Sequence, residues 1–168
     1  MLPTISTMER LKLMDEHTKL MYGLRNDSGG NFFHEMCISR TYGNLLKAQD
    51  ECENYGELLR IYDYDGNQCI HLAVIMSINY EFEGIQTLSL LLEMGADING
   101  RDRISGSTPL HIMVRKNFCI MAKWLCQQIG LNFGVTDYQG FTPYQLAQLY
   151  GNHRMISIIS YYQERLCY

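Results

Sequence analysis

The sequence lacks any long hydrophobic run and any long run of basic residues. Its longest apolar stretch, LSLLLEM at 88–94, is far shorter than the roughly 20 apolar residues that cross a bilayer. Charged side chains interrupt the start of the chain, so no signal peptide is predicted. The net charge is −4 with dispersed basic residues, which argues against binding to nucleic-acid phosphates. We therefore expect a soluble intracellular protein that contacts neither membrane nor nucleic acid.

Paired cysteines and the sequence strings of common catalytic sites are also missing. None of the 6 cysteines forms a Cys-x-x-Cys pair, so we expect reduced thiols. No phosphate-binding glycine string and no Gly-x-Ser-x-Gly string is present. His34 and Cys37 have the spacing of a base and a nucleophile on a helix, but a structural histidine followed by a buried cysteine has the same spacing, and we favour that interpretation. We predict no enzymatic activity and no cofactor.

What the sequence does contain is an internal repeat within a chain long enough for one domain. Four segments align on a glycine that precedes the start of a helix: SGGNFFHEM, YDGNQCIHLA, SGSTPLHIMV and YQGFTPYQLA. His34, His71, His111 and Gln145 occupy the same position in the four copies. Their spacing approaches the ankyrin period of about 33 residues, with extra residues chiefly in the first two copies.

The third copy carries a nearly complete set of ankyrin-repeat residues. The segment LLLEMGADINGRDRISGSTPLHIMV, at 90–114, has the Leu-Leu, Gly-Ala-Asp and Thr-Pro-Leu-His elements in register. Thr108 suits the N-cap of a helix and Pro109 its first position. The chain therefore resembles the ankyrin-repeat family. That resemblance implies an all-α solenoid of about four repeats, each a hairpin followed by two antiparallel helices.

We expect two regions, an N-terminal capping helix over residues 1–25 and an ankyrin-repeat domain over 26–168. The predicted repeats are about 26–62, 63–101, 102–136 and 137–168. The helix is predicted from a capping box at 6–9 and from apolar residues that share one helical face: Met8, Leu11, Met14, Met21 and Leu24. We favour a cap over the open end of the stack; the alternative is an amphipathic helix that binds a partner.

The extra residues of the second repeat are assigned to 77–84, the segment SINYEFEG. They should lengthen the first helix of that repeat or the loop that follows it. A longer loop costs little free energy, so we favour a tolerated surface insertion. The alternative is a contact surface, because Tyr80, Glu81 and Phe82 lie within it.

The aligned histidines do not predict a metal site. Packed helices lie roughly 8–10 Å apart, so histidines of different repeats cannot all come within about 2.1 Å of one zinc ion. We expect each imidazole to join neighbouring repeats through both ring nitrogens. The residues assigned to repeat structure are His34, His71, Thr108, Pro109, His111, Thr142 and Pro143.

The expected binding surface is the concave face formed by the hairpins and the first helices. Aromatic and arginine side chains at exposed hairpin tips make good anchors. The turns do not evidently require the residue types found at four of these positions: Tyr64, Arg101, Arg103 and Tyr138. The predicted partner-binding residues are Tyr62, Tyr64, Asp65, Arg101, Arg103, Tyr138 and Gln139.

A short chain of about four eroded repeats, with insertions in the early ones, resembles the viral IκB-like proteins of polydnaviruses (bracoviruses), called vankyrins. The resemblance implies a monomer or weak homo-oligomer that binds host NF-κB/Rel homology domain dimers and suppresses the host immune response. It would act in the host cytoplasm, with the host nucleus as a second compartment. Two alternatives stay open: an adaptor that recruits another host protein, for example to a ubiquitin ligase, and a generic ankyrin scaffold.

Asp27-Ser28-Gly29 matches the opening of a phosphodegron that marks some signalling inhibitors for destruction. The second serine of such a signal would fall on Phe32, which we expect to be buried. Register with the other copies places the three residues at the tip of the first hairpin, so we interpret them as a turn. The chain end also has no acidic, proline-rich tail of the cellular IκB type. The resemblance thus implies an inhibitor that resists signal-induced degradation.

Overall fold

The structure is a computed structural model that describes residues 16–51 and 55–165. Residues 16–23 are helical, and the described residues contain no β-strand. The remaining helices are α2 (Phe32–Ser39), α3 (Tyr42–Glu51), α4 (Gly56–Leu59), α5 (Cys69–Ile75), α6 (Glu81–Glu93), α7 (Pro109–Lys116), α8 (Cys119–Leu125), α9 (Pro143–Leu149) and α10 (His153–Arg165).

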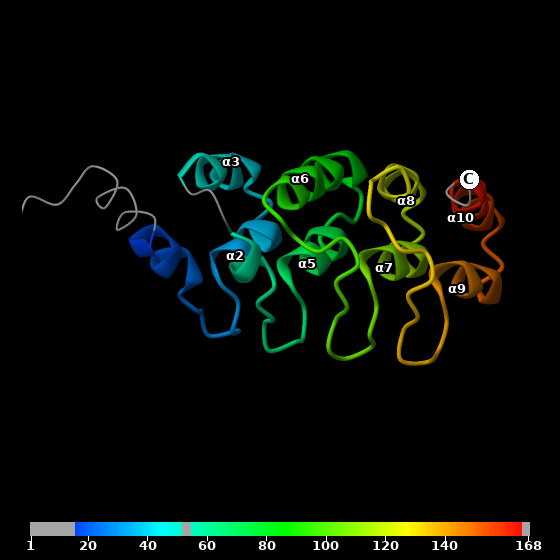
Figure 1. Ribbon diagram of the computed structural model, residues 1–168, viewed down its shortest axis with the longest axis horizontal. Helices are drawn as coiled ribbons and strands as arrows, with labels where there is room; N and C mark the ends of the chain where they lie inside the picture. The colour runs from blue at the N-terminus through cyan, green and yellow to red at the C-terminus, as the bar shows by residue number, and fades with distance from the viewer. Residues whose placement is uncertain (1–15, 52–54, 166–168) are drawn as a thin grey trace, which may run out of the picture.

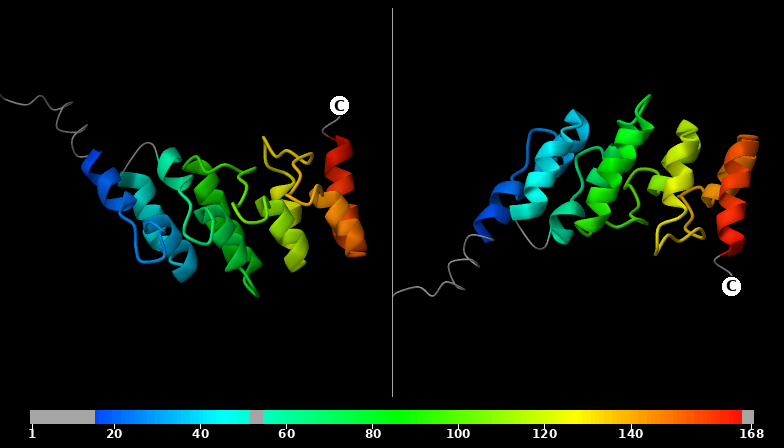
Figure 2. Two further views of the ribbon diagram at one scale, coloured as in Figure 1. Left: turned by 90° about the horizontal axis from the view of Figure 1, so that it is seen from below. Right: turned by 90° about the horizontal axis from the view of Figure 1, so that it is seen from above.

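The helices form two rows. An inner row consists of α2, α5, α7 and α9, an outer row consists of α3, α6, α8 and α10, and each helix packs against the next helix of its row (Figure 1). Before each inner helix the chain forms a hairpin loop that projects beyond the inner row (Figure 1). Both views of Figure 2 show the helices side by side along the whole stack. The predicted all-α solenoid of hairpins and helix pairs is confirmed.

Reciprocal hydrogen bonds fix the start of every inner helix. The N-cap residues are Asn31, Gln68, Thr108 and Thr142. The third helical residue, a histidine or in α9 a glutamine, accepts a hydrogen bond from the N-cap backbone N–H. Pro109 and Pro143 begin α7 and α9, where the absence of an N–H costs nothing. The cap therefore also fixes where each hairpin rejoins the inner row.

Apolar side chains between the two rows form one continuous core. It runs from Phe33 and Leu45 in the first repeat to Met155 and Ile159 in the last, and all four side chains are fully buried. Because each repeat contacts only its neighbours, its apolar faces are buried only when the next repeat is in place. The free energy of unfolding therefore depends on the contacts between neighbouring repeats as well as on each repeat itself.

The helical residues 16–23 contact the first repeat mainly through Tyr22. Its ring centroid lies 4.5 Å from that of Phe32 and 6.0 Å from that of Tyr55. Met21 and Leu24 are 53% and 58% exposed, so the prediction that they share the covered face is wrong. Tyr22 and Gly23 are half-buried instead, and a Cβ atom on Gly23 would lie 3.2 Å from Cδ2 of Leu58, so the helix meets the stack near its C-terminal end. Outside the described residues lie the expected capping box at 6–9 and Met8, Leu11 and Met14.

The extra residues of the second repeat lengthen a loop and the start of an outer helix. The inner helix α5 ends at Ile75 and α6 begins only at Glu81, whereas residues 117–118 alone separate α7 from α8. The expected longer loop is present, but the first helix is not longer. Oε2 of Glu81 accepts hydrogen bonds of 2.9 Å from the N–H groups of Ile120 and Met121 in the first turn of α8. Part of the insertion thus caps the next outer helix.

Glu81→Ala should lower the free energy of unfolding by about 1 kcal/mol, because two N–H groups of α8 lose their acceptor. Urea denaturation followed by circular dichroism measures the change. Glu83→Ala is the matched control: Glu83 is exposed on the same helix, and its loss should cost less than about 0.5 kcal/mol. Equal losses in the two variants would show that Glu81 does not act as a cap.

Candidate partner-binding surface

Four hairpin loops of similar geometry form one edge of the stack, and we call them fingers 1 to 4. Each finger opens with a backbone N–H that donates to the carbonyl of its last residue over 2.8 to 2.9 Å. The fingers span residues 26–30, 63–67, 102–107 and 137–141. An Asn or Asp occupies the first position of all four. The repeat in sequence is therefore also a repeat in backbone hydrogen bonding.

The first residue of each finger holds the turn with its side chain. In finger 3, Oδ1 of Asp102 accepts from the N–H groups of Ile104 (2.9 Å) and Ser105 (2.6 Å), and Oδ2 accepts from Ser107 N–H at 2.8 Å. Burial alone would raise the pKa of Asp102, but these hydrogen bonds together outweigh it and lower the pKa. The carboxylate is a structural part of the finger.

Adjacent fingers are joined by a ladder of backbone hydrogen bonds. The second residue of fingers 2, 3 and 4 donates its N–H to a carbonyl of the preceding finger over 2.8 to 2.9 Å; these donors are Tyr64, Arg103 and Tyr138. The rings of Tyr64 and Tyr138 lie against Gly29 and Gly106 of the preceding fingers, where a Cβ atom would come within 2.6 Å of a ring carbon. Only glycine permits this approach, so the fingers stack as one continuous edge.

Arginine side chains reinforce the contacts between fingers. The guanidinium carbon of Arg103 lies 4.2 Å from the ring centroid of Tyr62, and that of Arg101 lies 4.9 Å from the ring of Tyr138. Nε of Arg101 also donates to the carbonyl of Gly106 at 3.1 Å. The expectation that Tyr64, Arg101, Arg103 and Tyr138 have no structural duty is therefore wrong. Each of the four side chains contacts a finger or the residue that directly precedes one.

The same residues remain largely accessible on their outer side. Tyr64 is 75% exposed and Tyr138 is 61% exposed; Asp65 and Gln139 are exposed beside them, while Tyr62 is half-buried at the base of finger 2. The structure thus brings the seven predicted binding residues to one edge. It adds Ile104 at the tip of finger 3, which is 73% exposed. In the sequence, an isoleucine within a turn otherwise rich in serine and glycine could have indicated this exposed apolar side chain.

Three buried histidines connect the inner helices α2, α5 and α7 to the chain at the following finger. Nδ1 of His34, His71 and His111 accepts from the N-cap N–H over 3.0 to 3.2 Å. The other ring nitrogen, Nε2, donates over 2.9 to 3.1 Å to a carbonyl in the following finger or just before it; the acceptors are Asn67, Gly100 and Phe141. Burial lowers the pKa of all three imidazoles. They are therefore neutral rings that carry their proton on Nε2.

An ion pair between a half-buried arginine and a buried aspartate adds a link between the third and fourth repeats. Nη2 of Arg115, in α7, lies 2.7 Å from Oδ2 of Asp137 in finger 4. Arg115 also donates to Oγ of Ser107, so one side chain touches two fingers. The inner helix, the third finger and the fourth finger are fixed relative to one another by this cluster.

Burial suppresses thiol reactivity in the core. Cys37, Cys69, Cys119 and Cys126 are buried free thiols, and burial raises the pKa of Cys69 and Cys126 to about 12. Cys37, which the sequence spacing paired with His34, also has a raised pKa because it is buried. A nucleophilic cysteine needs a lowered pKa, because the thiolate is the reactive form.

The part of the chain that the structure describes forms neither a metal-binding cluster nor a membrane-spanning helix. Within 16–51 and 55–165, no three His, Cys, Asp or Glu side chains group in a way that could hold a metal ion. None of the helices in those ranges has the length and apolar character needed to cross a bilayer.

Comparison with known proteins identifies relatives over most of the chain. Residues 71–165 match the family described as ankyrin repeats (3 copies). I-Kappa-B like protein H1 of Microplitis demolitor bracovirus (isolate Webb) is 35% identical over 89% of this chain and 77% of its own length. I-Kappa-B like protein C2 of the same virus is 36% identical over 80% of this chain and 74% of its own length.

A solved structure resembles the stack as a whole. The ankyrin repeat domain of Bcl-3, described as a unique member of the IkappaB protein family, superposes with a TM-score of 0.72. The likeness covers 92% of this chain and 67% of that domain, with 25% sequence identity.

The neutral histidines predict a fall in stability at acid pH. The unfolded chain takes up protons near the ordinary histidine pKa of about 6.5, whereas the folded rings stay neutral to lower pH. Unfolding should therefore become easier as pH falls from about 7.5 to about 5.5, by up to about 1.4 kcal/mol per pH unit for each ring. Denaturant titrations at several pH values measure this slope.

His111→Gln should reduce that slope and cost about 1 kcal/mol at neutral pH, because the bond to the Phe141 carbonyl is lost. Glutamine at the equivalent position of the last repeat still accepts from its N-cap, through Gln145 Oε1 at 2.9 Å, so the helix cap should survive. His153→Gln, at an exposed histidine, is the control. An unchanged pH slope in His111→Gln would contradict the role assigned to the buried ring.

Proposed function

Since the chain belongs to the I-Kappa-B like proteins of the ankyrin-repeat family, we propose that it binds and inhibits host Rel-family (NF-κB) transcription factors. The proposal rests on one observation: this I-Kappa-B like chain has a finger edge whose exposed side chains are already fixed in position. It presents tyrosine and arginine side chains that neighbouring fingers hold in place. Side chains of these types, fixed before binding, make efficient anchors because little conformational entropy is lost on association.

The proposed mechanism is occlusion. The stack packs with its finger edge and inner helices against the dimerisation domains of the Rel protein and covers the basic nuclear-import segment. The net charge of −4 favours the approach of a basic peptide. We place this action in the host cytoplasm, with the host nucleus as a second compartment. Retention of the factor outside the nucleus would then suppress the host immune response.

The proposal includes resistance to signal-induced degradation. The serine of Asp27-Ser28-Gly29 is held within finger 1, where Ser28 Oγ donates to Oδ1 of Asn26 at 2.7 Å and the Ser28 carbonyl accepts from Tyr64 N–H at 2.9 Å. The position of a second degron serine is occupied by Phe32, a half-buried residue whose ring packs against Tyr22. A kinase would have to detach finger 1 from finger 2 to reach an extended substrate here.

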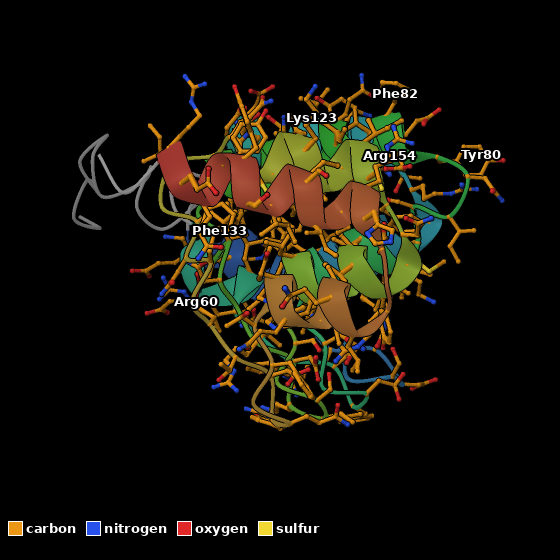
Figure 3. All side chains as sticks on the ribbon, turned by 90° about the vertical axis from the view of Figure 1, so that its right-hand side faces the viewer. Arg60, Tyr80, Phe82, Lys123, Phe133 and Arg154 are labelled. Atoms are coloured by element: carbon orange, nitrogen blue, oxygen red, sulfur yellow. The ribbon has the colours of Figure 1, made fainter. Side chains whose placement is uncertain are left out.

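Arg103→Glu should weaken Rel binding by at least about tenfold, since it reverses a charge at a predicted anchor. Co-precipitation with purified insect Rel homology domain dimers, followed by titration calorimetry, measures the loss. Lys123→Glu makes the same charge change on the outer helix α8, where Lys123 is exposed (Figure 3), and should bind like the wild type. The proposal fails if no Rel dimer is retained, or if both variants lose affinity equally.

Immune stimulation of insect cells should leave the half-life of the protein unchanged, because the turn offers no complete degron. A cycloheximide chase compares the wild type, Ser28→Ala and an endogenous cellular IκB as the positive control. Rapid loss of the wild type that Ser28→Ala prevents would contradict the interpretation of this segment as a turn.

A further inference from the structure

Exposed apolar side chains follow the edge at which inner helices turn into outer helices, which we call the turn edge. Its apolar members are Ile38, Ile78, Tyr80, Phe82 and Ile120. Phe82 is 70% exposed and Tyr80 is 45% exposed. Figure 3, which looks along the stack, shows both side chains on the opposite side from Arg60 and Phe133, and well away from the fingers. The turn edge and the finger edge are therefore separate surfaces.

A small pocket opens at the turn edge between the first and second repeats. Small buried residues, Cys37, Ala73 and Ser77, contribute to its lining, together with Arg40 and Tyr80, and its volume is about 100 Å³. The guanidinium carbon of Arg40 lies 4.2 Å from the ring centroid of Tyr80, so the two side chains hold one another in place. Ligand pockets usually measure roughly 300–1,000 Å³. This one suits a single aliphatic side chain.

The charges of the turn edge favour an acidic partner. Arg40, Lys116 and Arg154 are exposed there. The carboxylate of Glu81 already accepts two hydrogen bonds from α8, whereas Glu83, which also lines the pocket, opposes the basic residues. In a chain whose net charge is −4, three basic side chains beside an apolar patch form a local field that attracts negative charge.

We propose that the turn edge is a second docking surface, which takes an acidic, amphipathic peptide segment of another protein. An aliphatic side chain of the segment fills the pocket beside Arg40 and Tyr80, and further apolar side chains cover Phe82 and Ile120. Carboxylates of the segment approach the exposed basic residues. Because the fingers take no part in this contact, the protein can hold a Rel-family factor and a second protein at the same time.

Defined peptides test the surface directly. The probes are fluorescein-labelled peptides of roughly 12 residues, about three helical turns, with a central leucine or isoleucine, further leucines on the same helical face, and aspartate, glutamate and alanine elsewhere. Fluorescence anisotropy should show saturable binding that weakens as salt is added. A matched peptide with lysine in place of each acidic residue should not bind.

Two variants remove different parts of the surface. Thr87→Ile adds bulk to a residue that lines the pocket and keeps its β-branched shape. Arg40→Gly removes the guanidinium at a position where φ is 55°, which glycine adopts more readily than arginine, so folding should not suffer. Each variant should weaken peptide binding by at least about tenfold. Arg103→Gln, on the finger edge, should bind the peptide like the wild type.

Equal binding of acidic and lysine peptides would overturn the proposal, as would wild-type affinity in both Thr87→Ile and Arg40→Gly. Self-association in sedimentation experiments that Arg40→Gly abolishes would overturn it as well, since the occupant would then be a second copy of the chain. Arg40→Gly should still retain Rel dimers, whereas Arg103→Glu should lose them and keep the peptide. The two proposals can thus fail independently.

Discussion

A buried, neutral imidazole joins each of the first three inner helices to the following repeat, and the position of the finger edge depends on it. A ring without partners in the core would cost desolvation free energy at both nitrogens. His111 avoids that cost only when Thr108 N–H and the Phe141 carbonyl lie on its two sides. The ring therefore acts as a spacer between an inner helix and the next finger. In α9 the equivalent residue is Gln145, whose Oε1 accepts the cap bond from Thr142 N–H.

The finger edge is rigid because its binding side chains are also its packing side chains. Tyr64 rests on Gly29 and Tyr138 on Gly106, each with one ring face turned inward, and arginines lie over neighbouring rings. Fixing rotamers before binding removes a cost that flexible tips would incur on association. It also means that a mutation at the edge changes both stability and affinity. Charge changes at exposed positions such as Arg103 separate the two effects better than truncation of a tyrosine.

The sequence was sufficient for the fold because helix caps are local. Thr108 and Pro109, followed by His111, specify a helix start from adjacent residues. Apart from the recurring histidines, contacts between repeats were not predictable in this way. The backbone N–H groups that Glu81 caps lie 39 and 40 residues further along the chain, and the roles of Tyr64 and Arg103 depend on the register between fingers. Met21 and Leu24 fit a helical face, but periodicity alone does not say which face meets the stack.

The insertion in the second repeat falls where the stack tolerates change. On the finger side, an added residue has to fit within a ladder in which Tyr64, Arg103 and Tyr138 all donate to the preceding finger, and finger 3 accommodates one. On the turn edge, the loop before α6 takes no part in that ladder, and a longer loop costs little entropy. The insertion caps α8 through Glu81 and also presents Tyr80 and Phe82 to solvent. The turn edge is therefore the place where this fold can gain a binding surface without disturbing the one it already has.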